Sequence, residues 1–219
     1  MDSRFAVIPS TPYPLGATPV DGGVNFAIFS SAAKAIDLCL YAPGKPKEEV
    51  ARVRLSNRDG NIWHTAVSGI GPGWLYGFRA HGTYDPEQGQ RFTPQKLLID
   101  PYAKAVAGTP DWHPAMQLKS IAGADPRFQA DNGEVALKSV IVDDGFDWQG
   151  DHPPKIPWRK TVIYEAHVKG LTKLRESVPE QLRGTYAGLA HESVTSYLKD
   201  LGVTAIQLLP VHQHKPQIS

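Results

Sequence analysis

Apolar and polar positions alternate in short runs between residues 24 and 81, which is typical of an antiparallel β-protein. In the run 35–41, Ile36, Leu38 and Leu40 fall on one face of a strand and Asp37 falls on the other. Turn-forming residues separate the runs at intervals of about 8 to 14 residues. The pattern predicts strands with one buried face over residues 24–30, 35–41, 48–55, 62–67 and 75–81, and a further strand over 139–142.

A different pattern begins after residue 160. The run 161–168 is rich in β-forming residues and predicts a strand. After a long loop, apolar residues recur at helical spacing from Leu189 and end before Gly202, and glycine commonly terminates a helix at such a position. The run 203–209 is almost continuously apolar, which is typical of a parallel strand covered on both faces. Together these segments predict a βαβ unit with a right-handed crossover.

The chain is therefore predicted to be mainly β and to contain two domains of different class. Residues 1–150 are expected to form an immunoglobulin-like antiparallel β-sandwich, with a long excursion at 83–137 that is rich in Pro, Gly and Asp. Residues 151–160 are interpreted as a proline-rich linker. Residues 161–219 then begin the second domain with the βαβ unit.

Three long motifs carry a resemblance to a known family. They read YDPEQGQRFTPQKLLIDPYAKA at 84–105, VIYEAHVKGLTKL at 162–174 and RGTYAGLAHESVTSYLKDLGVTAIQLLPVH at 183–212. Nearly the whole chain resembles the bacterial glycogen debranching enzymes of the isoamylase type, in the α-amylase clan of glycoside hydrolases. The resemblance implies a glucan-binding type of sandwich followed by a (β/α)8 TIM barrel that hydrolyses α-1,6 branches. The second domain would then be an incomplete barrel.

The resemblance also implies that this chain lacks the catalytic residues of the family. Glycoside hydrolysis uses two carboxyl groups, and those of the family belong to later barrel strands that have no matching position here. We therefore assign no catalytic residue and expect the chain to be inactive by itself. Glu165 and His167 resemble an acid/base pair, but both fall within the predicted strand rather than at its C-terminal end. We expect them to form a buried, hydrogen-bonded structural pair.

Glucan binding has more support in the sequence than catalysis. Sugars stack on exposed aromatic rings while polar side chains hold their hydroxyl groups. The candidate substrate-binding residues are Trp74, Trp63, Tyr76, Arg79 and Trp112, with Lys96 as a further polar partner. Trp63 and Tyr76 lie within predicted strands, so core packing is the alternative for both, whereas Trp74 follows a Gly-Pro-Gly turn and is best placed for the surface. Residues 84–92 match a family motif whose expected role is to dock the sandwich on the barrel.

Composition argues against several other classes of function. The chain has 23 basic and 22 acidic residues without a block of like charge, so we expect neither nucleic acid nor membrane as a partner. Cys39 is the only cysteine and sits between leucines, which favours a buried reduced thiol and a cytoplasmic location. No segment approaches the roughly 20 apolar residues of a membrane helix. His212 and His214 form an HxH motif without a third ligand nearby, so we expect no metal and no cofactor.

Three functions remain open on these grounds. The chain could be the front of a debranching enzyme that acts on glycogen or limit dextrins, with glycogen or another α-glucan as its partner. It could instead be a free-standing glucan-binding or regulatory module. It could also be the product of an interrupted gene, in which case residues 203–211 would form an apolar edge strand that limits solubility. The oligomeric state is left open.

Overall fold

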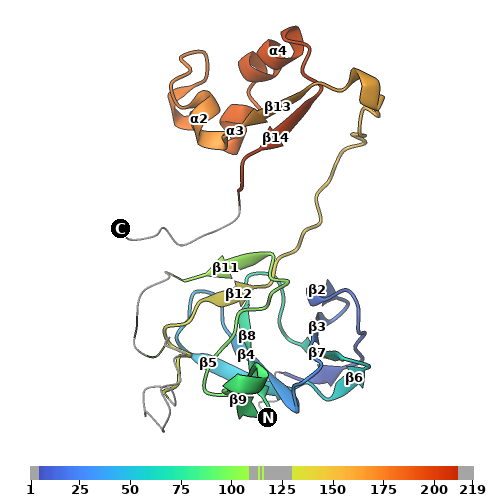
Figure 1. Ribbon diagram of the computed structural model, residues 1–219, viewed down its shortest axis with the longest axis vertical. Helices are drawn as coiled ribbons and strands as arrows, with labels where there is room; N and C mark the ends of the chain where they lie inside the picture. The colour runs from blue at the N-terminus through green and yellow to red at the C-terminus, as the bar shows by residue number, and fades with distance from the viewer. Residues whose placement is uncertain (1–4, 109–112, 114, 116–129, 212–219) are drawn as a thin grey trace. The chain divides into compact units, whose positions relative to one another are not determined.

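The computed structural model describes residues 5–108, 113, 115 and 130–211, and the chain divides into two compact units (Figure 1). The first unit, Met1–Gly145, contains two antiparallel sheets. The second unit, Phe146–Ser219, contains a two-stranded parallel sheet with helices.

The first sheet of the sandwich is built around β3. This strand pairs with β2 on one side and with β7 on the other, antiparallel in both cases. The remaining edge of β7 is shared by β1 and β6, which pair with opposite ends of it. The strands are β1 (Val7–Ile8), β2 (Gly16–Val20), β3 (Gly23–Phe29), β6 (Asn57–Asp59) and β7 (Ile62–Ser68).

The second sheet has the order β11-β12-β8-β4-β5 and is antiparallel throughout. Its longest pairing joins β4 and β8 over seven residues each, from Ala35↔His81 to Tyr41↔Leu75. The strands are β4 (Ala35–Tyr41), β5 (Glu49–Arg54), β8 (Leu75–His81), β11 (Ala105–Ala107) and β12 (Lys138–Val140). All six strands predicted from the alternating runs are therefore present, while β1, β2, β6 and β11 are additional.

The core of the sandwich lies between the two sheets. Tyr76 of the second sheet meets Phe26 of the first edge to face, with ring centroids 5.1 Å apart, and its ring also meets Phe78 at 5.8 Å. Such pairs add about 0.5–1.5 kcal/mol to the burial of their area. The fully buried residues of this core include Val24, Phe26, Ile36, Leu38, Leu40, Val53, Leu55, Val67, Tyr76, Phe78 and Ile141. The predicted antiparallel β-sandwich is confirmed.

The expectation of one buried face for 35–41 is wrong, because both faces of β4 are buried. Cys39, on the side away from the main core, has no exposed surface and is a free thiol. It belongs to a second apolar cluster with Tyr41, Leu75, Leu97 and Ala136. The last two residues come from the excursion that follows β8. The excursion therefore acts as a third layer over the outer face of the second sheet.

Lys138 is buried beneath this third layer. Its ammonium group lies 4.8 Å from the ring centroid of Tyr41 and donates a hydrogen bond to the carbonyl of Ala136. Burial, reinforced by the charge of Arg79, lowers the pKa of Lys138 to about 8, whereas the charge of Asp131 and the thiol of Cys39 act to raise it. Between about pH 8 and the ordinary lysine pKa, the unfolded chain therefore binds more protons than the folded chain, and stability rises with pH.

We expect Lys138→Met to remove this rise. The wild type should gain about 1 kcal/mol of stability relative to the variant between pH 7 and pH 9. Urea unfolding at several pH values measures the difference. The comparison is limited to pH 9 because burial raises the pKa of Cys39 to about 12, so the unfolded thiol ionises first above pH 9. This effect opposes the Lys138 rise in the wild type and lowers the stability of the variant. Parallel pH profiles for the two proteins would show that Lys138 is not the cause.

The second unit has the predicted βαβ connection. Strands β13 (Ile163–Ala166) and β14 (Ala205–Leu208) are parallel and in register from Ile163↔Ala205. The predicted first strand was too long, because the chain turns into a helix after Ala166. The connecting elements are α2 (Val168–Thr172), η4 (Glu180–Leu182), α3 (Tyr186–Leu189) and α4 (Glu192–Asp200), and the 3-10 helix η3 (Trp158–Lys160) precedes β13.

Helices cover one face of this parallel pair. Val178, Val194 and Leu198 form the buried cluster, against which Tyr164 and Ile206 of the two strands pack. On the opposite face, alternate residues are open to solvent, namely Ile163, Glu165, Ala205 and Gln207. The expectation that the run 203–209 is covered on both faces is therefore wrong for the described structure. Gly202 follows α4 with φ +77°, as expected for the residue that ends a helix.

Candidate functional site

Two of the aromatic residues proposed for sugar binding lie inside the sandwich. Trp63 on β7 is 8% exposed, its indole nitrogen donates to the carbonyl of Ser30 at 3.0 Å, and Arg58 lies 4.7 Å from the ring centroid. Tyr76 on β8 is 1% exposed and its hydroxyl donates to Asp100 Oδ2 at 2.7 Å. The core-packing alternative raised from the sequence therefore describes the placement of both rings.

Trp74 is partly buried at the entrance of β8. Its ring meets Phe5 edge to face at 5.7 Å and packs against the main core, so part of the indole remains at the surface. Trp112 lies outside the described residues, as do His212 and His214. Of the proposed aromatic residues, Trp74 is thus the one that the structure places partly at the surface.

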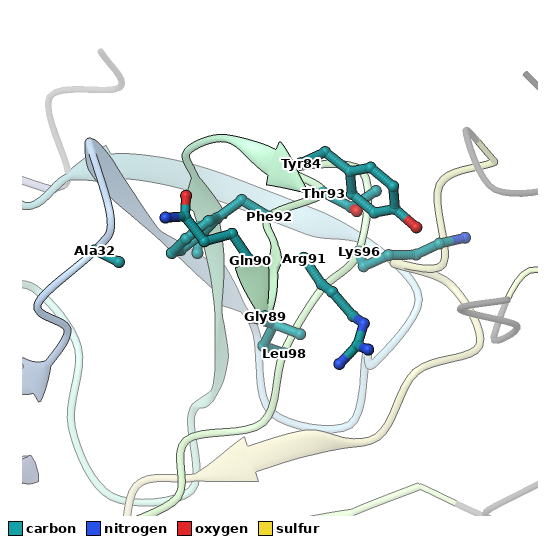
Figure 2. A pocket seen from close by; sticks show the side chains of 10 residues that line it. Ala32, Tyr84, Gly89, Gln90, Arg91, Phe92, Thr93, Lys96 and Leu98 are labelled. Carbon is teal, nitrogen blue, oxygen red and sulfur yellow. The ribbon is translucent and has the colours of Figure 1, made fainter. Parts of the chain in front are cut away.

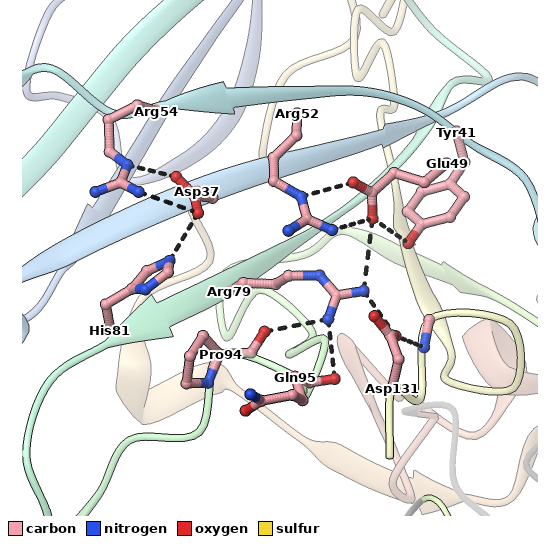
Figure 3. A network of polar contacts seen from close by, with 11 residues as sticks. Asp37, Tyr41, Glu49, Arg52, Arg54, Arg79, His81, Pro94, Gln95 and Asp131 are labelled. Atoms are coloured by element: carbon pink, nitrogen blue, oxygen red, sulfur yellow. Dashed lines mark hydrogen bonds and ion pairs between the residues drawn. The ribbon is translucent and has the colours of Figure 1, made fainter. Parts of the chain in front are cut away.

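Arg79 is 2% exposed and holds the excursion to the second sheet (Figure 3). One terminal nitrogen donates to the carbonyls of Pro94 and Gln95, at 3.1 and 2.9 Å. The other donates to Asp131 Oδ1 at 2.8 Å and lies 3.5 Å from a carboxylate oxygen of Glu49. Although burial opposes the charge, the hydrogen bond to Asp131 raises the pKa of the Arg79 guanidinium above its ordinary value. Through these contacts the Arg79 side chain holds the excursion against the second sheet.

Lys96 has the same kind of environment. It is 2% exposed, and its ammonium group donates to the carbonyls of Ala115 and Ala130, at 2.7 and 2.8 Å. Burial lowers the pKa of this ammonium group. The two cations proposed as sugar contacts therefore bind backbone carbonyls of the excursion instead of facing solvent.

A small hairpin at the start of the excursion, directly after β8, presents aromatic and polar side chains together. It consists of β9 (Tyr84–Asp85), the 3-10 helix η1 (Pro86–Gln88) and β10 (Gln90–Arg91). Asp85 caps η1 by accepting from the amide of Gln88, and Gly89 at φ +75° closes the turn by donating to the carbonyl of Pro86. Tyr84 and Arg91 consequently pair across the two strands.

The hairpin forms one wall of a cavity of about 300 Å³, which we call the hairpin pocket (Figure 2). Phe92 packs its ring directly on the backbone of Gly82, where a Cβ atom would lie 2.5 Å from the ring, so a glycine is required there. Tyr84 is 46% exposed and Arg91 is also exposed. The pocket is lined by Ala32, Ala80, Tyr84, Gly89, Gln90, Arg91, Phe92, Thr93, Lys96 and Leu98.

This lining combines the two kinds of contact that sugar recognition uses. The Tyr84 ring and the apolar side chains Phe92 and Leu98 offer surface for the C–H face of a pyranose ring. The Gln90 amide can donate and accept hydrogen bonds, while the Arg91 guanidinium offers five donors for hydroxyl oxygens. Sequence reasoning named residues 84–92 only as a docking motif. The signal for a site was the alternation of aromatic and polar residues on either side of the Gly89 turn.

The expected buried pair of Glu165 and His167 is wrong. Both side chains are exposed, and His167 lies beyond the end of β13. Its Nδ1 accepts a hydrogen bond from the amide of Gly170 at 3.0 Å and so caps α2. A histidine that caps a helix has a local structural role, and nothing in this geometry supplies an acid/base partner for Glu165.

Over the described part of the chain, His, Cys, Asp and Glu side chains do not gather in groups of three or more that could hold a metal ion. Helices as long and apolar as a membrane crossing requires are likewise not found among the described residues.

Comparison with known proteins places the hairpin pocket within a recognised module. Residues 14–103 match the family described as carbohydrate-binding module 48 (isoamylase N-terminal domain). The chain is 45% identical over 211 residues to the glycogen debranching enzyme of Salmonella schwarzengrund (strain CVM19633), and 44% identical to that of Salmonella typhi. These matches cover 96% of this chain and 31% of each enzyme, so the chain spans less than a third of the length of these curated relatives.

Solved structures agree with this assignment. The catalytic module of the multi-modular glycogen-degrading pneumococcal virulence factor SpuA is 29% identical, with a TM-score of 0.63 over 91% of this chain and 27% of that one. Pullulanase from Paenibacillus barengoltzii, in complex with maltohexaose and α-cyclodextrin, is 23% identical with a TM-score of 0.62 over 92% of this chain and 28% of that one, and shows the fold alone. The resemblance is thereby confirmed: nearly the whole chain is similar to the N-terminal portion of bacterial glycogen debranching enzymes, and residues 14–103 of its first unit match the carbohydrate-binding module 48 family.

Proposed function

We propose that the sandwich binds α-glucan chains at the hairpin pocket. The observation that carries the proposal is that every residue lining this pocket falls within residues 14–103, the span that matches a carbohydrate-binding module. Tyr84 supplies the stacking surface, and Gln90 and Arg91 supply hydrogen bonds to hydroxyl groups. Among the residues proposed from the sequence, Trp74 is retained as a second candidate contact because part of its ring is at the surface.

Replacing Tyr84 with alanine is expected to weaken glycogen binding about fivefold or more, because the variant loses a stacking contact of about 1 kcal/mol or more. Retardation of the full chain in native gels that contain increasing glycogen measures this. Tyr102→Ala is the matched control, since Tyr102 is 45% exposed compared with 46% for Tyr84 but does not line the pocket. Equal retardation of the Tyr84 variant and the wild type would place the glucan elsewhere.

We further propose that the chain serves a glycoside hydrolase that acts on α-1,6 branches of glycogen or limit dextrins, as the N-terminal part of such an enzyme. Among the described residues, the two parallel strands carry one carboxylate, Glu165, whereas the reaction requires two at a defined separation. The chain alone is therefore expected to bind glucan without cleaving it. Release of reducing ends from a limit dextrin above a buffer blank would contradict this.

A free-standing glucan-binding or regulatory module is the alternative. Such a module would bind glucan in the same way but would not be joined to a catalytic domain.

We also propose a cytoplasmic location, supported by the free and fully buried thiol of Cys39. Localisation of a tagged full chain by fractionation tests this, and recovery outside the cytoplasm would overturn it.

A further inference from the structure

Phe146 and Trp148 form an exposed aromatic pair at the start of the second unit. Their ring centroids are 4.8 Å apart and their planes are inclined by 73°. Phe146 is 70% exposed and Trp148 is 65% exposed. Exposure of two large apolar rings to water is unfavourable in free energy. Exposed apolar surface of this kind commonly marks a binding site. Neither residue falls in the span 14–103 that matches the carbohydrate-binding module.

The backbone beneath the pair is held in a defined turn. Asp147 Oδ1 accepts a hydrogen bond from the amide of Gln149 at 2.8 Å, and the amide of Asp151 donates to the carbonyl of Trp148 at 2.8 Å. Gln149 and Gly150 both adopt positive φ, at 48° and 80°. The turn and the ring contact fix both aromatic side chains in advance, so a ligand that stacks on them loses little conformational entropy in ordering them.

The chemistry around the pair selects the class of ligand. Asp147 and Asp151 lie close to Trp148 in the sequence and are exposed. Their negative charge disfavours anions such as phosphates and nucleic acids, and their carboxylate oxygens can accept hydrogen bonds from hydroxyl groups. A neutral polyol with an apolar face satisfies both requirements.

We propose that Phe146 and Trp148 form a second α-glucan subsite, in addition to the hairpin pocket. This inference rests on the proposed glucan binding of the chain and extends it to a site in the second unit. Trp148 provides the larger stacking surface, and Phe146 fixes its orientation through the edge-to-face contact.

The test is retardation of the full chain in native gels that contain glycogen. Trp148→Ala is expected to weaken retention about twofold to twelvefold, as loss of one aromatic contact of about 0.5–1.5 kcal/mol predicts, and Trp148→Phe should retain part of it. Trp158→Ala is the matched control, because Trp158 is 82% exposed and lies in η3, outside the pair. Its retention is expected to equal that of the wild type.

The possible outcomes separate this inference from the proposed function. Wild-type retention that Tyr84→Ala weakens and Trp148→Ala leaves unchanged would overturn the second subsite and leave the hairpin pocket standing. Absence of wild-type retention would overturn both. The Trp148 variant could instead change its sedimentation coefficient while its glycogen retention stays unchanged. This result would show that the pair contacts another protein chain, and it would also overturn the inference.

Discussion

Replacing Arg79 with methionine is expected to lower the free energy of unfolding of the sandwich by about 3 kcal/mol. The variant keeps an unbranched apolar stem but leaves the carbonyls of Pro94 and Gln95 without their donor and Asp131 without its cation. Loss of one partner from a fully buried pair costs about 3–5 kcal/mol. The lower end applies here because the Asp131 side chain is 58% exposed and water can hydrate it in the variant.

Amide hydrogen exchange of β4 and β8 measures this change within the sandwich itself, independently of the second unit. Lys45→Met is the control, since the Lys45 and Glu48 side chains are 66% and 68% exposed and form an ion pair at the surface of the sandwich. We expect the control to cost less than about 1 kcal/mol. Equal effects of the two substitutions would mean that Arg79 does not anchor the excursion.

Replacing Lys96 with methionine is expected to cost about 2–3 kcal/mol. The ammonium group of Lys96 binds two backbone carbonyls, those of Ala115 and Ala130, and is buried while doing so. Hydrogen bonds to charged groups contribute about 1.5–3 kcal/mol each, and part of this is offset because the variant no longer buries a charge. The loss should be local, so the amides of residues 130–136 are expected to exchange faster than those of β3.

Lys104→Met controls for removal of a lysine. Lys104 binds Asp144 at 2.8 Å, but both side chains are well exposed, and a surface pair contributes about 1 kcal/mol or less. Exchange in the Lys104 variant should resemble that of the wild type throughout the sandwich. Unchanged exchange at residues 130–136 in the Lys96 variant would show that this side chain does not hold the excursion.

The strands of the sandwich could be predicted because alternation reports directly on a buried face. Residues 35–41 and 75–81 were predicted with the bounds that β4 and β8 have. The second buried face of β4 could not be predicted, because Asp37 and Arg79 are polar residues that are buried only through partners distant in sequence. The end of β13 was missed for a local reason, since β-branched Val168 continues the strand pattern while His167 caps a helix.

The candidate site was predicted only in part. Aromatic and cationic residues were proposed as sugar contacts, but the sequence does not show whether a ring lies in the core or at the surface. Trp63 and Tyr76 are buried, whereas Tyr84 is exposed on a short hairpin. The exposed pair of Phe146 and Trp148 was assigned to the end of the predicted sandwich, residues 1–150, next to the proline-rich linker at 151–160. Exposure depends on tertiary packing, which local patterns do not encode.

The most direct test of the account is calorimetric titration of the full chain with maltoheptaose, with cellohexaose as the β-linked control. Glucan binding through the sandwich predicts a saturable heat with maltoheptaose that Tyr84→Ala reduces and Tyr102→Ala does not, and no saturable heat with cellohexaose. Absence of saturable binding to maltoheptaose, or equal binding of both oligosaccharides, would contradict the assignment of α-glucan recognition to the hairpin pocket.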